Sequence, residues 1–461
     1  MTVTEALLIR GAGLLDPASG LDQQGDLLIV DGRIARMGPA IRDGDVPPGC
    51  RKVSGAGLVA CPGFIDLHAH FREPGYEHKE TIATGSMAAA RGGFTTVCCM
   101  PNTNPPMDSS SVVEYVLGKA REAGAVRVLP IGCVSKGRAG HELAEMWEMA
   151  QAGVVGFSDD GNPVADPHLM RQALTYSRGL GLPIINHCQD AGLSQGGVVN
   201  EGWLSHRLGL HGWPAAAEEV MVARDIALAE LTGGRLHLAH LSTAGSVELV
   251  RRAKERGIPV TAEVTPHHLP LDESWVVGHD QAGPLASPLT LSAYDTNGKV
   301  NPPLRTRRDV EALIAGLRDG VIDAIATDHA PHAVTDKLVT FDAAEFGISG
   351  LETAVGALMG LVHRGEISLK LLVERLTVGP QRVLGDGYNH LGTLRQGAPA
   401  DVVLFDPEQE WVVRSDEFAS KGKNTPLDGV TLRGRVVATI AGGRLVYSAL
   451  PELQPAPEGS E

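Results

Sequence analysis

Two patterns of apolar and polar positions alternate along the middle of the chain. Short apolar runs rich in β-branched residues are separated by longer segments with apolar residues at helical spacing. Residues 244–257, AGSVELVRRAKERG, show the helical pattern and end in a basic turn before glycine. Eight strand-like runs follow one another from position 58: LVACPGFIDLHAH, FTTVCCMPN, VRVLPIGCVS, GVVGFSDDG, LPIINHCQD, RLHLAHLS, IPVTAEVTPHHL and IDAIATDHAPH.

This order predicts an α/β fold, a (β/α)8 TIM-like barrel over residues 59–384. The flanks, residues 1–58 and 385–448, carry only short strand-like runs and turns. Because neither flank is long enough for a secure core of its own, we expect them to form one small β-sandwich domain built from both chain ends. The Pro-rich, acidic tail, residues 449–461, is predicted to be disordered.

Composition narrows the functional classes. A formal net charge of −15 gives no electrostatic support to a nucleic-acid partner. We expect no membrane partner, since no run approaches 18 apolar residues, and no signal peptide, since the start MTVTEALLIRGAG lacks a basic region and an apolar core. The six cysteines form no CxxC pair and suggest no disulfide framework, so we expect a reducing, cytoplasmic compartment.

Several of the apolar runs end in side chains that can bind a metal ion. In a barrel the carboxyl ends of all strands meet at one face, so such residues converge although they are far apart in sequence. His68 and His70 also share one face of their strand, because side chains alternate. The candidates are His68 and His70 on the first run, Asp159 and Asp160 on the fourth, His187 on the fifth, His240 on the sixth and Asp328 on the eighth.

Each residue alone has a plainer reading. A single histidine such as His240 is more often a satisfied polar group, and Asp328 could cap a helix. The coincidence at five strand ends favours a metal site instead. Imidazole and carboxylate suit Zn²⁺, and six ligands exceed one tetrahedral ion. They match two ions ~3.5–4 Å apart, bridged by a carboxylate and a water whose pKa falls to about 7.

A set of motifs extends over nearly the whole chain: PGFIDLHAHFREPG, ARGGFTTVCCMPNTNP, GFSDDG, HCQD, HLST, TAEVTPHHL, KVNPPLR, ATDHAPH, FGISGLET and SKGKNTP. Through these motifs the sequence resembles the cyclic amidohydrolases, and most closely the class I dihydroorotases. Hydantoinases and allantoinases look similar, but their bridge is a carboxylated lysine, whereas the fourth run here carries aspartate.

The resemblance implies a role for each matching position. His68, His70 and Asp328 would hold one zinc ion, His187 and His240 the other, and Asp160 would bridge them, with Asp159 as the rival for that role. Arg72, Asn102 and His332 would bind the substrate carboxylate; Asn301 and the backbone of Phe346 and Gly347 would contact the ring, and His70 also belongs to the substrate-binding set. The alternative for Arg72 is a surface salt bridge with Glu73 or Glu77.

The implied reaction is the reversible cyclisation of N-carbamoyl-L-aspartate to (S)-dihydroorotate plus water, in de novo pyrimidine (UMP) biosynthesis. A metal-bridging hydroxide would be the nucleophile, and Asp328 would act as general base and then general acid. Two alternatives stay open: a hydantoinase- or allantoinase-type enzyme, and an inactive dihydroorotase-like scaffold subunit. We expect two Zn²⁺ per chain, a small-molecule substrate, a homodimer and association with aspartate transcarbamoylase.

Two segments depart from the family pattern. Residues 281–298 form a longer and less polar insertion than we expect. The segment AAEFG, residues 343–347, lacks the proline that usually precedes the FG pair.

Overall fold

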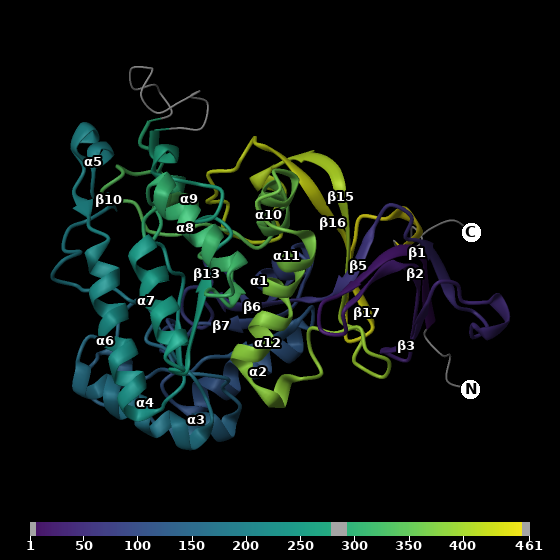
Figure 1. Ribbon diagram of the computed structural model, residues 1–461, viewed down its shortest axis with the longest axis horizontal. Coiled ribbons are helices and arrows are strands. Elements are labelled where there is room, and N and C mark those ends of the chain that lie inside the picture. The colour runs from purple at the N-terminus through teal and green to yellow at the C-terminus, as the bar shows by residue number, and fades with distance from the viewer. Residues whose placement is uncertain (1–5, 278–292, 454–461) are drawn as a thin grey trace.

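The computed structural model describes residues 6–277 and 293–453. Figure 1 shows a helix-covered barrel beside an extended sheet, with both chain ends on the side of the sheet. Among the helices in these two ranges, none is long and apolar enough to span a membrane.

The barrel is built from parallel strands in two hydrogen-bonded groups, with orders β6-β7-β8 and β14-β13-β12-β9. The fourth run is not a continuous strand, but Phe157 bridges Gly132 on one side and Ile184 on the other, which joins the groups. His329 bridges Ala69 and closes the ring. The strands are β6 (Phe64–Ala69), β7 (Phe94–Cys99), β8 (Arg127–Pro130), β9 (Ile184–Asn186), β12 (Leu236–Leu238), β13 (Val260–Val264) and β14 (Ala324–Ile325).

Helices cover the outside of the barrel and alternate with its strands, as the sequence pattern predicts (Figure 1). They are α1 (Ile82–Arg91), α2 (Ser110–Ala123), α3 (Met146–Ala152), α4 (Pro167–Leu180), α6 (Ala216–Thr232), α7 (Ala244–Glu255), α8 (Arg307–Arg318), α10 (Ala354–His363), α11 (Leu369–Leu376) and α12 (Val378–Leu384). The short elements α5 (Trp203–Leu208), α9 (Val334–Lys337), β10 (Val199–Asn200) and β11 (Gly212–Trp213) lie in the connections. Helix α8 begins with a capping box: the Thr306 hydroxyl accepts a hydrogen bond from the backbone N–H of Asp309, and the Asp309 carboxylate accepts one from the backbone N–H of Thr306.

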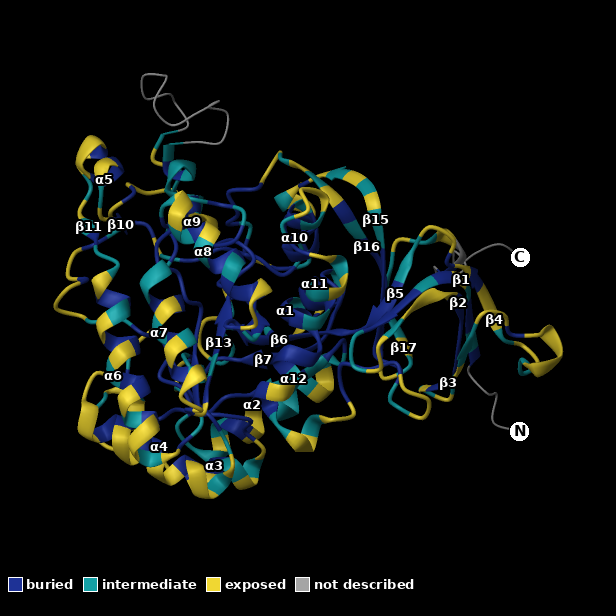
Figure 2. Cartoon of the chain, in the orientation of Figure 1, coloured by how far each residue is buried: buried dark blue, intermediate teal, exposed yellow. Residues whose placement is uncertain are grey.

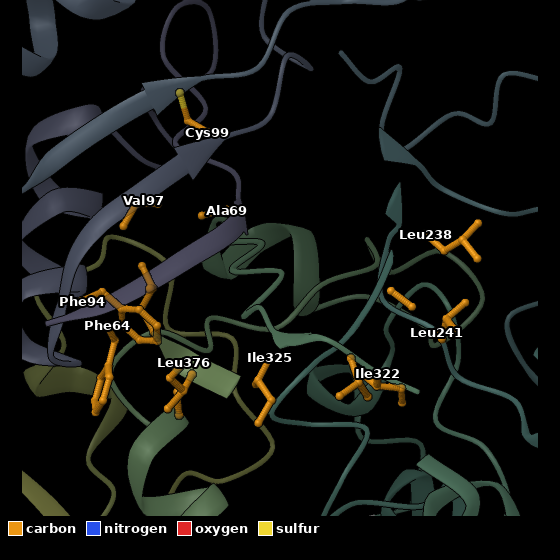
Figure 3. Packing of buried hydrophobic residues seen from close by; sticks show 14 of the residues in the cluster. Phe64, Ala69, Phe94, Val97, Cys99, Leu238, Leu241, Ile322, Ile325 and Leu376 are labelled. Atoms are coloured by element: carbon orange, nitrogen blue, oxygen red, sulfur yellow. The ribbon is translucent and has the colours of Figure 1, made fainter. Parts of the chain in front are cut away.

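The packing separates the two sides of β6. Ile65 and Leu67 belong to a buried cluster that also contains Cys98 of β7, Ile185 of β9 and Ala324 of β14, so this cluster fills the inside of the barrel. Phe64 and Ala69 belong to the main core, which packs the strands against the surrounding helices. Figure 3 shows part of the main core, where the rings of Phe64 and Phe94 meet edge to face with centroids 5.8 Å apart. In Figure 2 the barrel strands β6 and β7 are buried along their length, while the surrounding helices expose their outer faces.

The second body is an eight-stranded sheet with the order β17-β16-β15-β5-β1-β2-β3, and β4 beside β1. The two chain ends join where β15 pairs antiparallel with β5, for example Val402 with Pro62. The strands are β1 (Ala6–Asp16), β2 (Leu21–Val30), β3 (Arg33–Gly38), β4 (Arg51–Ser54), β5 (Val59–Pro62), β15 (Val402–Val412), β16 (Thr431–Ala441) and β17 (Arg444–Ser448). The predicted combination of a barrel with a β-domain from both chain ends is confirmed.

The predicted domain boundaries stay a proposal, with two observations beside them. Residues 59–62, placed in the barrel by the prediction, form β5 of the eight-stranded sheet. Within the predicted disordered tail, Leu453 is buried in the apolar cluster of this sheet and Leu450 packs against it. Residues 454–461 and most of the 281–298 insertion lie outside the described residues.

Candidate metal centre

Six ionisable side chains converge at the carboxyl ends of the barrel strands. The side chain of each is at most 5% exposed, so bulk water cannot form hydrogen bonds with polar atoms that have no partner inside the protein. They are His68, His70, Asp160, His187, His240 and Asp328, the set predicted from the sequence. Two groups with ligand atoms close enough for one ion are His68, His70 and Asp328, and His68, Asp160 and His240.

The first group surrounds one carboxylate oxygen. Asp328 Oδ1 lies 3.1 Å from His70 Nε2 and 3.5 Å from His68 Nε2. Asp328 caps no helix, because the next helix, α9, begins at Val334. The helix-cap alternative for Asp328 is therefore wrong.

The second group surrounds Asp160. Its Oδ1 lies 3.5 Å from both His187 Nδ1 and His240 Nε2, and 3.4 Å from His68 Nε2. Its Oδ2 lies 3.5 Å from His70 Nε2. The carboxylate of Asp160 thus reaches histidines of both groups, which is the position that a bridging ligand needs.

The neighbouring Asp159 points elsewhere. Its Oδ1 accepts hydrogen bonds from the backbone N–H groups of Val134 and Ser135, at 3.0 and 3.1 Å. Its Oδ2 accepts a bond from the Ser135 hydroxyl. Asp159 therefore holds the loop after β8, and the geometry favours Asp160 over Asp159 as the bridge.

Outer contacts fix how three of the histidines face the centre. His68 Nδ1 lies 2.9 Å from Glu263 Oε1, His70 Nδ1 lies 2.8 Å from Asn102 Oδ1, and His187 Nε2 lies 2.8 Å from Gln189 Oε1. Each oxygen accepts the ring N–H, so the other ring nitrogen turns its lone pair inward. The sequence analysis missed Glu263, although a carboxylate inside the apolar run TAEVT was a visible signal.

Two unpaired buried atoms test whether a metal fits. His68 Nε2 and Asp160 Oδ1 are fully buried and have no hydrogen-bond partner in the described part of the chain. An unmatched buried nitrogen lone pair beside an unmatched carboxylate oxygen is costly unless a cation lies between them. Nitrogen and oxygen donors of this kind suit Zn²⁺ and related divalent ions, so the residues fit a metal.

The local electrostatics keep the carboxylates ionised. Burial alone would raise the pKa of Asp160, but His68 and hydrogen bonding from His187 and His240 hold it well below its ordinary value. Burial likewise works against ionisation of Asp328, and His68 and His70 lower its pKa below the usual range. Both carboxylates are therefore anionic at neutral pH, the charge state that suits binding of a cation.

Three residues at this face have positive φ angles without being glycine: Arg72 at 62°, His240 at 31° and Asp328 at 45°. Such conformations typically cost about 1–3 kcal/mol and persist only where the surroundings enforce them. Two of the three are candidate ligands and the third is a candidate substrate contact. The strain therefore coincides with the proposed chemistry.

A cavity of about 240 Å³ opens above the centre. It is lined by every residue predicted to bind substrate: His70, Arg72, Asn102, Asn301, His332, Phe346 and Gly347. Gly161, Ala330 and Glu345, which the sequence analysis did not single out, also line it. Asn301 Oδ1 is buried and has no hydrogen-bond partner among the described residues, so it can accept a bond from a ligand.

Arg72 is directed toward this cavity rather than toward a surface carboxylate. Within residues 6–277 and 293–453, no ion pair joins it to Glu73 or Glu77, and its Nε donates to Pro331 O at 3.3 Å. Glu73 instead accepts from the backbone of Ile82, and Glu77 accepts from its own turn. The salt-bridge alternative for Arg72 is therefore wrong.

His332 is held as a neutral ring. Its Nε2 lies 2.8 Å from Phe346 O and its Nδ1 lies 3.2 Å from Lys79 Nζ. The first contact requires an N–H on Nε2, and the second requires a lone pair on Nδ1. Burial, with Arg72 and Lys79 nearby, lowers the pKa of His332 to about 2, so it carries no charge at neutral pH.

Two buried lysines support the loop that carries Phe346. Lys299 Nζ donates to Asp342 O and Ala344 O at 2.9 and 2.6 Å, and it lies 4.3 Å from the centroid of the Phe346 ring. Lys337 Nζ donates to Glu345 O at 2.6 Å. These residues were not predicted, because each binds backbone carbonyls whose positions depend on the fold of distant segments.

Comparison with solved structures shows which class of proteins shares this fold. An L-hydantoinase (dihydropyrimidinase) from Arthrobacter aurescens matches with a TM-score of 0.83 at 24% identity, covering 97% of this chain and 96% of that one. A D-hydantoinase (dihydropyrimidinase) from Thermus sp. matches with a TM-score of 0.79 at 25% identity, covering 96% and 95%. The fold is that of the cyclic amidohydrolases, and the histidine–aspartate cluster agrees with it.

Comparison with known sequences gives the family. The dihydro-orotase-like family model matches residues 57–246. A dihydroorotase of Syntrophus aciditrophicus (strain SB) is 48% identical over 96% of this chain and 99% of its own length. A dihydroorotase of Anaeromyxobacter sp. (strain K) is 50% identical over 96% and 98%. The chain belongs to the dihydroorotase family, as its motifs predicted.

Proposed function

We propose that the protein is a dihydroorotase that interconverts N-carbamoyl-L-aspartate and (S)-dihydroorotate. The observation that carries this proposal is Asp160, an aspartate in contact with histidines of both ligand groups. Family membership and the guanidinium of Arg72 on the cavity wall support it. A hydantoinase-type activity is less favoured, because the bridge position here is not a lysine.

The six buried side chains would hold two divalent ions, which we propose to be zinc. His68, His70 and Asp328 would bind one, His187 and His240 would bind the other, and Asp160 would contact both. When bound, such ions make water a better nucleophile at neutral pH and polarise the scissile carbonyl. Glu263 keeps His68 oriented for this task.

The cavity would orient the substrate ring through contacts at the two ends of that ring. Arg72 is suited to the substrate carboxylate, because a guanidinium offers paired donors that match its two oxygens. Asn102 and His332 would lie at the same end. Asn301 Oδ1, which has no partner within the described residues, would accept from a ring N–H. The backbone groups of Phe346 and Gly347 would complete the contacts to the ring.

Asp328 is placed to move the proton of the reaction. In the hydrolytic direction water adds to the ring carbonyl carbon, and the bond from that carbon to the imide nitrogen breaks. Asp328 accepts a proton from the attacking water and delivers it to the departing nitrogen, so it acts first as base and then as acid. In the cyclisation direction the same residue runs the transfer in reverse.

Three further expectations accompany this function. The protein would work in the cytoplasm, as a homodimer, and in association with aspartate transcarbamoylase. They rest on the family resemblance.

Substrate turnover tests the proposal. The purified protein, loaded with zinc, should hydrolyse dihydroorotate and form it from N-carbamoyl-L-aspartate, with hydantoin turned over far more slowly at equal concentration. Ring opening can be followed by the loss of ultraviolet absorbance. Faster turnover of hydantoin than of dihydroorotate would overturn the assignment in favour of the alternative.

A further inference from the structure

One stretch of mostly polar residues lies outside the candidate metal centre and its cavity wall. The segment SKGKNTP, residues 420–426, lies in the long connection between β15 and β16. It therefore belongs to the part of the chain that builds the eight-stranded sheet. The connection nevertheless reaches the barrel, because a Cβ built on Gly422 would lie 2.4 Å from Pro331 Cβ.

Asn424 is the residue of this motif with the most contacts to the barrel. Its Nδ2 donates to Ala330 O at 3.0 Å and to Gly347 O at 2.9 Å. Its Oδ1 accepts from the backbone N–H of His332 and from the Ser349 hydroxyl, both at 2.9 Å. An amide has two N–H donors and two acceptor lone pairs, so these four bonds use its full capacity.

The partners of Asn424 belong to two different loops of the cavity wall. One loop, residues 330–332, follows β14 and carries His332. The other begins at Gly347, which also lines the cavity. The loops are in close contact, since a Cβ on Gly347, at φ 148°, would lie 2.6 Å from Ala330 O. Asn424, only 4% exposed and not itself part of the cavity wall, joins them from behind.

We propose that Asn424 is a positioning residue for substrate recognition. It fixes the backbone of His332 relative to that of Gly347, and thereby the spacing between the two ends of the ring site. The proposal rests on the substrate contacts proposed for His332 and Gly347. The hydrogen bonds of the Asn424 side chain go to Ala330, His332, Gly347 and Ser349 rather than to the six candidate ligands, so its loss should change substrate binding more than metal content.

Asn424→Asp provides a sharp test, because it keeps the shape but replaces the two donors with an oxygen that faces two carbonyls. We expect the KM for dihydroorotate at pH 8 to rise about 10- to 100-fold, the range typical when a reacting group is misplaced by about 1 Å. A protonated carboxyl restores one donor, so kcat/KM relative to the unaltered protein should recover as pH falls. Asn424→Ala should raise KM without this new pH dependence.

Lys423→Met is the matched control. Lys423 lies in the same segment and donates to two backbone carbonyls, but these belong to Phe418 and Ser420 within its own loop. We expect an unchanged KM and at most a lower melting temperature. An equal KM rise in Lys423→Met and in the Asn424 variants would overturn the proposal, because it would indicate general loosening of the segment.

Two further variants separate the remaining outcomes. If His332→Ala raises KM but folded, fully metal-loaded Asn424 variants keep the normal KM, the positioning role is wrong and the substrate contact stands. If neither changes KM, the substrate contacts themselves are wrong. If the Asn424 variants do not fold, Ser349→Ala decides: losing one of the four bonds should raise KM about 2- to 10-fold, and a normal KM would overturn the role.

Discussion

Replacing Asp328 with asparagine is expected to lower kcat by about 10²- to 10⁴-fold while most of the metal stays bound. Asparagine keeps the size and one acceptor oxygen, but it cannot carry a proton. General acid–base catalysis commonly contributes this much. The metal should remain, because five of the six candidate ligands are unchanged. His68 and His70 still face one metal position, and His187 and His240 face the other, with Asp160 close to both pairs. Steady-state kinetics and elemental analysis of the same sample check both parts.

Asp159→Asn is the matched control for this experiment. Asp159 is an equally buried carboxylate at a strand end, but its oxygens bind Val134 and Ser135 rather than the centre. We expect it to lower the melting temperature and to leave kcat within a few-fold of normal. Near-normal turnover by Asp328→Asn, with its metal in place, would remove the proton transfer from the mechanism.

Replacing Arg72 with methionine is expected to reduce kcat/KM for dihydroorotate severely. A buried charged hydrogen-bonding pair that loses one partner typically costs about 2–5 kcal/mol. Methionine fills similar space, so the loss should come from the missing guanidinium rather than from a cavity. Arg72 has no ion pair with Glu73 or Glu77 in the described ranges, so few other contacts are lost.

A second ligand shows whether Arg72 binds the substrate carboxylate or only supports the fold. Binding of dihydrouracil, the same ring without the carboxylate, should change far less when it is measured as a competitive inhibitor. The kcat/KM of Arg72→Lys for dihydroorotate should lie between those of the unaltered protein and Arg72→Met, because lysine keeps the charge but not the paired donors. Equal damage to dihydroorotate and dihydrouracil would mean that Arg72 only supports the fold.

The sequence predicts that the six candidate ligand side chains converge because they obey a local rule. A polar residue that directly follows an apolar run sits at the carboxyl end of a strand, and a closed parallel barrel gathers those ends. His68, His187, His240 and Asp328 all follow this rule. Asp159 and Asp160 obey it equally, so the choice between them needed the structure, where only Asp160 faces the histidines.

The residues that hold the candidate ligands and the cavity loops in place do not follow strand ends in this way. Glu263 lies inside a strand, and its partner His68 is 195 positions away. Asn424 and Lys299 bind backbone carbonyls of loops whose paths depend on several distant segments. The fourth barrel run also differs from its expected form. Within the described residues, Phe157 alone of this run forms β-bridges to both neighbours, although the backbone N–H groups of Val155 and Ser158 also donate to Pro130 O and Gly132 O.

The central claim is that two metal ions, held with an aspartate bridge, make the protein a dihydroorotase. Its most direct test is stepwise addition of zinc to the metal-free protein in buffer freed of carbon dioxide, with dihydroorotate hydrolysis measured at each step. If two ions and an aspartate bridge form the centre, activity rises to a plateau near two equivalents of zinc and does not increase when bicarbonate is added. Full activity below half an equivalent under strong chelation, or activity that returns only with bicarbonate, would contradict it.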